Sequence, residues 1–540
     1  MRRTKRRFEA AALAFSTLFL GLFFAYPLVR LFTHAFSAAS GDRVADVLVS
    51  STFAQTLWFT LWQAIASTLL TFAVGLPAAA VLARYRFVGR SVVRALITVP
   101  FVLPTVVVAG AFRALFDRFG VQDALVGSVW AILVAHVFFN VAVVVRVVGS
   151  FWGHLDPATE QAARVLGASP AQTFRRVTLP LLGPAMAAAA AIVLLFTFTS
   201  FGVILLLGDG RHPTVETEIW RYGAQRLELD VAAGIAVVQL LAVIALSVAS
   251  TVLQSRHAVA QRLVGDRERA RRPRTRREAT LVVVTLGPLL VFLIAPLVVL
   301  IERSIDRGRD WSIEAYRELT VRSDLLGTSP LASLGNSLRV AGAATLIAVI
   351  TGTIMSFAVV YGRRRWSSLL DTTLLLPLGT SAVTLGFGLF LAFDRTPLDW
   401  RTSWWMLPIA HALIGIPFVV RSEVPVLRSL DHRLRAVAAT LGASPARVLR
   451  AVDLPVAARA ISVGAAFAFV VSMGEFGAAS VLPRASSDIT APLAIFRLLG
   501  TPGGAPRTLA FALSVSLFVV VAVAVALIDR LRPPGGQSGW

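Results

Sequence analysis

The sequence predicts an all-α integral membrane protein with about twelve transmembrane helices in two tandem six-helix halves. Three observations carry this prediction. Of the 540 residues, 56% are hydrophobic and only 15% are charged, and the mean hydropathy is +0.73. Apolar stretches of about 20 residues recur along the chain, each long enough to cross a bilayer core of roughly 30 Å. A polar loop also occurs twice, 275 residues apart.

The apolar stretches predict the individual membrane helices. Twelve segments qualify as candidate spans. Their centres lie near residues 21, 68, 104, 139, 194, 244, 290, 347, 380, 412, 469 and 518. The first follows the basic run Met1–Arg7, as the apolar part of a signal peptide would, but no small-residue cleavage site comes after it. We therefore interpret this segment as an uncleaved membrane helix.

The charge distribution predicts the orientation of these helices. The net charge is +22, which in a soluble protein would suggest binding to nucleic acid. With the N-terminus in the cytoplasm, twelve spans place the arginine-rich segments Arg84–Arg94, 256–278, Arg363–Arg365 and the C-terminal tail on the cytoplasmic side, as the positive-inside rule requires. We therefore predict no nucleic-acid partner and place both termini in the cytoplasm. The absence of cysteine excludes disulfides and thiolate metal sites.

The repeat divides the chain into two halves. We predict a first transmembrane half over residues 1–255, a basic cytoplasmic linker over 256–279, and a second transmembrane half over 280–540. Matches continue outside the polar loops at the same offset, as in Ala135-His136 and Ala410-His411, or Phe201-Gly202 and Phe476-Gly477. Each half has an even number of spans, so both have the same orientation. The expected symmetry axis lies along the membrane normal, with a substrate path between the halves.

The duplicated polar loop is the most specific motif of the chain. We call residues 156–180 the first loop and residues 431–455 the second loop. Between 160–180 and 435–455, 11 of 21 positions are identical without a gap. A single capped connector between two spans would explain one copy, but two copies that match at Gly, Ser-Pro and Leu-Pro indicate an element that docks on a partner.

The residues of each loop predict a helix, a turn and a second helix. Asp156 and Asp431 are candidate N-caps of the first helix. Gly167 and Gly442 end it, because glycine adopts the left-handed conformation at low cost. Ser and Pro then start the second helix, and a Leu-Pro pair is expected to end it. The Ser-Pro and Leu-Pro pairs are Ser169-Pro170 with Leu179-Pro180 in the first loop, and Ser444-Pro445 with Leu454-Pro455 in the second.

Both loops resemble the "EAA" loop of ABC importer permeases, which docks on the ATPase subunit. The resemblance assigns the coupling role to Glu160, Gln161, Ala162, Ala163, Gly167, Ser169, Pro170, Leu179 and Pro180 in the first loop, and to Ala438, Gly442, Ser444, Pro445, Leu454 and Pro455 in the second. The second loop departs from the family pattern because it lacks the acid. We expect it to dock more weakly, or through arginines such as Arg435, Arg447 and Arg450.

The chain lacks the sequence motif of a P-loop ATPase. Its single lysine, Lys5, lies in the N-terminal tail, and a Walker A loop requires a lysine that reaches the phosphates. We find no catalytic constellation and predict no catalytic residue, no metal site and no cofactor bound by this chain. The resemblance implies that ATP and Mg²⁺ bind to a separate ATPase, present in two copies. It further implies an extracytoplasmic substrate-binding protein and a location in the bacterial inner membrane.

Ionisable residues within the predicted spans are few. Glu475 is identified as the one acid deep in a span, and its repeat counterpart is Ser200. A charge at that depth costs at least about 2.5–3.5 kcal/mol and usually faces a cavity or a partner. We predict that both residues lie on the translocation path, while a structural hydrogen bond between the halves remains the alternative for Glu475. His136 and His411 are expected to make structural hydrogen bonds.

The cargo is the least determined feature. Fused permeases with two such loops resemble thiamine permeases and iron(III) permeases. The runs Leu133–Asn140, Ile204–Gly210 and Thr214–Gln225 look thiamine-like. Thiamine or a related compound is therefore the favoured cargo, with iron(III) as the alternative and other small solutes after it. An ion-coupled secondary transporter is the alternative of another class, but it would need intramembrane ion sites. A non-transport scaffold or receptor is a further alternative.

Overall fold

The computed structural model describes residues 2–37, 41–256, 270–306, 311–362, 367, 370–371, 373–374, 380–394, 399–400, 402–483 and 485–531. The described residues form helices, with only three isolated β-bridges between loop segments. The predicted basic segments 257–269 and Arg363–Arg365 and the end of the C-terminal tail lie outside the described residues. The all-α membrane fold is confirmed.

The helices of the first half are α1 (Arg2–Leu20), α2 (Tyr26–Ala35), α3 (Gly41–Val49), α4 (Ser51–Arg84), α5 (Arg90–Val102), α6 (Thr105–Arg118), α7 (Gln122–Leu125), α8 (Val129–His154), α9 (Pro157–Val165), α10 (Pro170–Thr173), α11 (Leu179–Phe198), α12 (Gly202–Leu207), α13 (Val215–Trp220) and α14 (Leu229–Arg256). Those of the second half are α15 (Arg276–Ile305), α16 (Glu314–Glu318), α17 (Pro330–Tyr361), α20 (Ala382–Ala392), α21 (Met406–Ser429), α22 (His432–Thr440), α23 (Pro445–Val448), α24 (Leu454–Gly474), α25 (Gly477–Val481), α26 (Ala491–Gly500) and α27 (Gly504–Leu531).

Ten of the described helical segments are long and apolar enough to cross a membrane, or eleven if the pair α5–α6 counts as one span. The continuous span predicted near residue 104 is wrong, because α5 and α6 meet there at an angle of 105°. The break falls at Leu103, whose helical conformation is disfavoured by the following Pro104. Near residue 380 the structure describes only the short helix α20, and residues 375–379 lie outside the described part.

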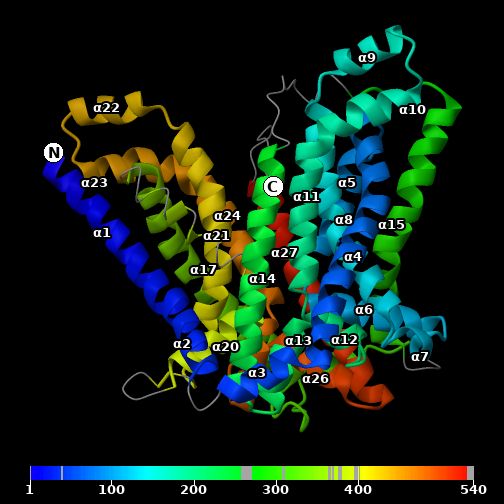
Figure 1. The fold of residues 1–540 in the computed structure, drawn as a ribbon, viewed down its shortest axis with the longest axis vertical. Coiled ribbons are helices and arrows are strands. Elements are labelled where there is room, and N and C mark those ends of the chain that lie inside the picture. Colours follow the sequence, from blue (N-terminus) through cyan, green and yellow to red (C-terminus); the bar gives the residue numbers. More distant parts are fainter. Residues whose placement is uncertain are drawn as a thin grey trace.

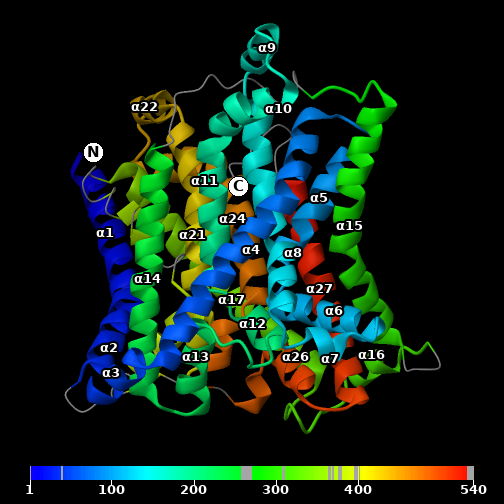
Figure 2. The ribbon, with the colours of Figure 1, turned by 45° about the vertical axis from the view of Figure 1, so that its right-hand side comes forward.

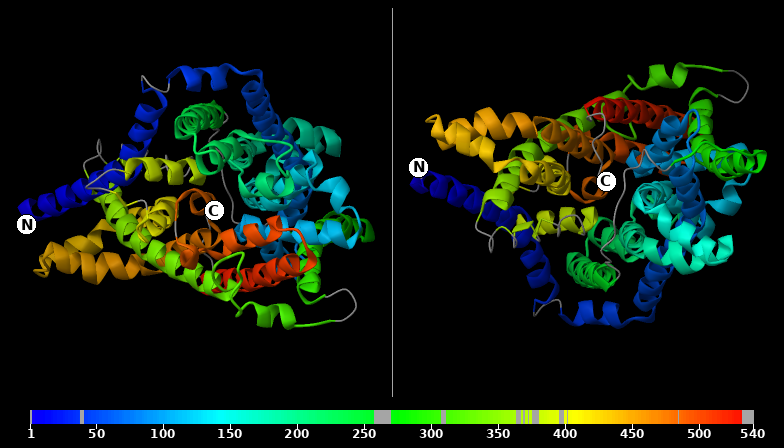
Figure 3. Two further views of the ribbon diagram at one scale, coloured as in Figure 1. Left: turned by 90° about the horizontal axis from the view of Figure 1, so that it is seen from below. Right: turned by 90° about the horizontal axis from the view of Figure 1, so that it is seen from above.

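Two groups of short helices gather at opposite ends of the molecule (Figure 1). Helices α9, α10, α22 and α23 lie at one end, which we call the loop end, and the start of α1 lies there too. Helices α3, α12, α13 and α26 lie at the other, the opposite end. The turned view in Figure 2 shows the same separation. Seen from above, the two loops lie far apart across the molecule (Figure 3).

The same close packing occurs in the centre of each half. Helix α4 packs along α8, and α17 packs along α21. A Cβ placed on Gly75 would lie 2.9 Å from Val144 Cβ, and one on Gly352 would lie 2.8 Å from Val419 Cγ1. Small residues let membrane helices approach closely, so packing replaces the missing hydrophobic driving force. The two pairs are repeat counterparts, with offsets of 277 for the glycines and 275 for the valines.

The two halves are interlocked through their first helices. Helix α1 packs against α17 of the second half, and α15 packs against α4, α5 and α6 of the first half. The end of the linker also contacts the first half, since Arg86 N donates to Arg271 O at 2.9 Å and Arg271 N donates to Arg84 O at 3.1 Å. The proposed boundaries at 255 and 279 stay a prediction, but neither half packs as an independent body.

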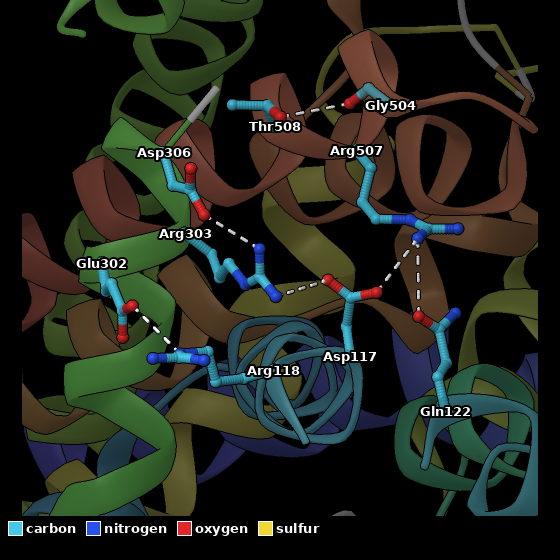
Figure 4. A network of polar contacts seen from close by, with 9 residues as sticks. All are labelled: Asp117, Arg118, Gln122, Glu302, Arg303, Asp306, Gly504, Arg507 and Thr508. Carbon is cyan, nitrogen blue, oxygen red and sulfur yellow. Dashed lines mark hydrogen bonds and ion pairs between the residues drawn. The ribbon is translucent and has the colours of Figure 1, made fainter. Parts of the chain in front are cut away.

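A network of ion pairs joins the halves at the opposite end (Figure 4). Asp117, at the end of α6, lies 3.2 Å from Arg303 of α15 and 3.8 Å from Arg507 of α27. Arg118 pairs with Glu302 of α15 at 3.2 Å. All these side chains are between about a quarter and just over half exposed. The network therefore connects the first half to two helices of the second half.

Candidate coupling loops and translocation path

The first loop has the local structure that its sequence predicts. Asp156 caps α9, because its Oδ1 accepts a hydrogen bond from Ala158 N at 2.9 Å. Gly167 follows with φ +86°. Ser169 starts α10 with a capping box, in which Ser169 Oγ accepts from Gln172 N at 3.3 Å and Gln172 Oε1 accepts from Ser169 N at 2.9 Å.

The second loop repeats this geometry. Asp431 Oδ1 accepts from Arg433 N at 2.9 Å and caps α22. Gly442 has φ +80°. Ser444 Oγ accepts from Arg447 N at 3.3 Å at the start of α23. The predicted helix, turn and helix are therefore confirmed in both copies.

The prediction that the Leu-Pro pairs end the second helix is wrong. Each pair lies inside a longer helical segment, Pro170–Phe198 in the first half and Leu449–Val481 in the second. A single π-helical turn precedes each pair, at Phe174–Thr178 and at Leu449–Asp453. Proline removes one backbone donor, and a wider turn changes the hydrogen-bond pairing just where that donor is missing. The loop is thus continuous with the span that follows it.

The tips of both loops expose large apolar side chains. Val165 and Leu166 are each 87% exposed in the first loop, and Leu441 is 81% exposed in the second. Gln161, Ala162, Gly167, Ser169, Gly442 and Ser444 are exposed as well, while Ala163 and Ala438 are half-buried. Apolar side chains exposed on a polar helical loop are suited to contact another protein.

Glu160 is half-buried and faces the body of the first half. Its Oε1 accepts from Thr178 Oγ1 at 2.7 Å and from Arg84 Nη2 at 3.2 Å. Arg84 ends α4, and its guanidinium lies 5.3 Å from the centre of the Trp152 ring. We call Arg84, Glu160 and Thr178 the first junction, because it ties α9 both to the π-helical turn and to the end of α4.

Arg435 occupies the corresponding place in the second loop. Its Nε donates to Asp453 Oδ1 at 2.7 Å, and its guanidinium lies 4.1 Å from the centre of the Tyr361 ring at the end of α17. We call Tyr361, Arg435 and Asp453 the second junction. The expectation that Arg435 docks on a partner is therefore not supported by its orientation. Arg447 and Arg450 are exposed and line a shallow hollow together with Ser444.

Ser200 and Glu475 lie at the ends of corresponding helices. Ser200 Oγ is 2.9 Å from His136 Nε2, and His136 Nδ1 is 2.9 Å from Ser67 Oγ. Glu475 Oε1 accepts from Ala478 N at 3.1 Å, at the start of α25. Both Ser200 and Glu475 retain some exposed surface although the residues after them are buried. His411 Nδ1 lies 2.8 Å from Ser472 Oγ, so both histidines make the expected buried hydrogen bonds.

A cluster of four aromatic rings follows these two positions and crosses the boundary between the halves. Phe201 stacks on Phe476 with ring centres 5.2 Å apart. Trp220 lies 6.1 Å from Phe201, and Phe496 lies 5.2 Å from Phe476. Phe201 and Phe476 are repeat counterparts at offset 275, and Trp220 and Phe496 at offset 276. The cluster is therefore symmetric in position although one pair differs in residue type.

The identification of Glu475 as the one deep acid is incomplete. Glu423 is fully buried within α21, where its Oε1 accepts from Thr353 Oγ1 at 2.8 Å. Glu216 in α13 is 1% exposed and accepts hydrogen bonds from Gln239 of its own half and from Ser381 of the other half. Sequence reasoning missed Glu216 because it lies in a short, mixed segment between spans. Among the described residues, no group of three or more His, Asp or Glu side chains could hold a metal ion.

Comparisons with known proteins agree with this arrangement. The family described as "Binding-protein-dependent transport system inner membrane component" matches twice, over residues 73–262 and 344–533. The thiamine transport system permease protein ThiP of Brucella abortus (strain 2308) is 26% identical over 465 residues, which are 82% of this chain and 82% of that protein. The ThiP protein of Escherichia coli (strain K12) is 26% identical over 461 residues, covering 82% and 83% of the two chains.

A further relative is half as long. The sulfate transport system permease protein CysT of Salmonella typhimurium (strain LT2) is 33% identical over 264 residues, which are 47% of this chain and 94% of that protein. A half-length relative fits a chain made of two fused halves. Because the family matches both halves and most of the chain, this multi-pass protein belongs to the inner-membrane components of binding-protein-dependent transport systems.

Proposed function

We propose that this chain is the permease subunit of an ATP-driven importer that carries thiamine or a related compound into the cytoplasm. An extracytoplasmic binding protein delivers the cargo, and two copies of a separate ATPase subunit supply the energy. The observation that carries the proposal is the pair of matching loops, which resemble the ATPase-docking loop of ABC importer permeases. The thiamine assignment is supported by full-length relatives named as thiamine permeases, which this chain resembles over 82% of its length.

The loops are suited to transmit force from one ATPase copy each. Each loop offers exposed apolar residues at its tip and is continuous with a membrane span, α11 or α24. A rigid-body displacement of the loop therefore moves the span directly, without a flexible connection in between. The coupling residues predicted above remain assigned to this role in the proposal, with Glu160 as an internal anchor rather than a docking group.

The positions of the basic segments support a cytoplasmic loop end. Arg84, Arg86 and Arg271 gather there through the contacts of the linker with α4 and of α4 with the first loop. In Figure 1 the start of α1 lies at the same end as α9 and α22. The positive-inside rule then places this end in the cytoplasm, together with both termini.

The proposed path runs between the halves, past Ser200 and Glu475, to the aromatic cluster near the opposite end. The cluster closes the path on the outer side, because rings from both halves contact each other there. Glu475 directly precedes Phe476 of this cluster in the chain, at the end of α24 that faces away from the loop end. A carboxylate at this position favours a cation such as thiamine over an oxyanion such as sulfate.

The proposal is tested by uptake in cells with and without this gene. Labelled thiamine, iron(III) and sulfate are supplied side by side, and sulfate is included because of the half-length sulfate permease relative. We expect loss of thiamine uptake alone. Loss of iron or sulfate uptake with intact thiamine uptake would rule out thiamine as the cargo. Unchanged uptake of all three solutes would leave only the family assignment.

A further inference from the structure

The two loops are fixed to the body of the protein at the same repeat positions, but with opposite polarity. Residues 160 and 435 correspond at offset 275, and so do residues 178 and 453. The first pair is an acid on the loop and a hydroxyl on the π-helical turn, 2.7 Å apart. The second pair is a guanidinium on the loop and an acid on the turn, also 2.7 Å apart. The same connection is thus made from exchanged chemical groups.

The third member of each junction comes from the end of α4 in the first half and of α17 in the second, and it also differs in chemical type. Gly75 and Gly352 set the register between α4 and α17 at offset 277. In this register Arg84 corresponds to Tyr361, and these residues end the two helices. The first half places its cation on the span and its acid on the loop. The second half places its cation on the loop and an aromatic ring on the span.

We propose that Arg435 is a positioning residue that holds the second loop in the geometry that Glu160 gives the first. The missing acid of the EAA pattern is then a rearrangement within the junction and not the loss of a docking group. Both loops present a similarly anchored helix to two identical ATPase copies. This inference rests on the proposed function for its role in coupling, but its structural part stands on the contacts alone.

The burial of the second junction strengthens the contacts that hold the second loop. The side chain of Asp453 is 8% exposed and that of Arg435 is 25% exposed, while Arg84 in the first junction is 42% exposed. Exposed ion pairs contribute little. A charge-assisted hydrogen bond that is largely withdrawn from water contributes more, and the Tyr361 ring adds a cation–π contact. Arg435 is therefore a structural anchor before any partner binds.

The first experiment uses the purified full chain in lipid nanodiscs and measures amide hydrogen exchange in α22. Arg435→Glu places two acids against each other, and we expect exchange in α22 to accelerate about tenfold as the helix detaches. The double variant R435E/D453T recreates the Glu–Thr pair of the first loop and should restore exchange to nearly the wild-type rate. Adding Tyr361→Arg completes a copy of the first junction and should restore it fully.

Two further variants keep the result interpretable. Arg433→Glu makes the same charge change on the exposed face of α22 and should leave exchange unchanged. If R435E does not accumulate in the membrane, Asp453→Thr replaces it, and R435E/D453T must then exchange more slowly than D453T. Equal exchange in wild type and R435E, an effect of R433E as large as that of R435E, or no recovery in R435E/D453T would each overturn the inference.

The second experiment separates this inference from the proposed function. The chain is purified with its co-expressed ATPase subunit, reconstituted with the binding protein, and assayed for ATP hydrolysed per thiamine imported. We expect R435E to hydrolyse ATP with several-fold less import, and R435E/D453T to recover the wild-type ratio. If the wild type imports no thiamine, the proposed cargo is wrong. The hydrogen-exchange result then still shows whether Arg435 anchors the second loop. If R435E/D453T recovers the wild-type exchange rate in α22 but not the wild-type ratio of ATP hydrolysed to thiamine imported, the role of Arg435 in coupling is overturned.

Discussion

Glu475 combines a charge with a position between the two halves. Its carboxylate accepts a hydrogen bond from Ala478 N at the start of α25 and retains exposed surface just before the ring of Phe476. A backbone amide holds the carboxylate in place, so the side chain does not require a cation from the protein itself. If Glu475 lies on the proposed path, this arrangement leaves its carboxylate available to a cationic solute.

Glu475→Gln should therefore reduce thiamine import about tenfold, which corresponds to the loss of one charge-assisted contact. The amount of protein in the membrane should stay near the wild-type level, because glutamine keeps the shape and the acceptor. Import per molecule of inserted protein is the measurement. Glu423→Gln is the matched control, since Glu423 is buried in α21 against Thr353, and we expect it to affect stability more than import. Equal losses of import and insertion in E475Q would assign a structural role to Glu475.

At the scale of elements, each loop depends on one residue with a left-handed backbone. A Cβ on Gly167 or Gly442 would have no neighbour within 4 Å, so a substitution there causes no clash. The penalty lies in the backbone, since φ is +86° and +80°. A β-branched residue is strongly disfavoured in this region, whereas asparagine tolerates it.

Gly167→Val or Gly442→Val should distort the loop and uncouple ATP hydrolysis from transport while the spans stay inserted. The strain costs on the order of 1–2 kcal/mol, enough to populate other loop conformations. Gly167→Asn and Gly442→Asn, at the same positions, should retain coupling because they preserve the turn. The ratio of ATP hydrolysed to thiamine imported is compared for the four variants. Normal coupling in both valine variants would show that the loops do not transmit the motion.

The sequence predicts the elements whose structure is local. The caps at Asp156 and Ser169 and the turn at Gly167 are determined by residues within four positions, so the sequence predicts them. The sequence does not predict the continuous helix through Leu179-Pro180, because a π-helical turn depends on the packing of the whole segment. The junction of Arg435 with Asp453 and Tyr361 joins residues 18 and 74 positions apart, and only the fold brings them together. Glu216 lies in a short segment between spans, and its contact with Ser381 of the other half likewise exists only in the folded protein.

At the scale of the whole molecule, the contacts between the halves at the opposite end decide how easily that end opens. The loops lie apart at the loop end (Figure 3), and ion pairs join the halves at the opposite end (Figure 4). Stacked aromatic rings join them there as well. This is the arrangement expected when the path is closed on the outer side. In the proposed importer, weakening those contacts should shift the population toward a state open at this end, and we expect that shift to raise ATP hydrolysis by the partner ATPase.

Asp117→Asn removes the charge that pairs with both Arg303 and Arg507 across the boundary. These pairs are partly exposed, so we expect only about a two- to fivefold rise in ATP hydrolysis without binding protein, and less at high salt. Asp306→Asn is the control, because it removes the acid that pairs with Arg303 three residues earlier, inside the second half. A rise of the same size in D306N would trace the effect to Arg303 itself and not to the connection between the halves.

The stacked rings of Phe201 and Phe476 allow the stronger test, because they are buried and lie at the centre of the boundary. An aromatic pair contributes about 0.5–1.5 kcal/mol beyond its buried area, so Phe476→Ala should raise hydrolysis without binding protein more than D117N does. Phe418→Ala disrupts a similar stack with Phe467, 6.3 Å apart, but within the second half, and should not raise it. The double variant F201A/F476A should raise hydrolysis by less than the sum of the two single variants, because both single variants already remove the Phe201–Phe476 stack. Fully additive effects, or a rise in F418A as well, would mean that the rings do not act together as the outer closure.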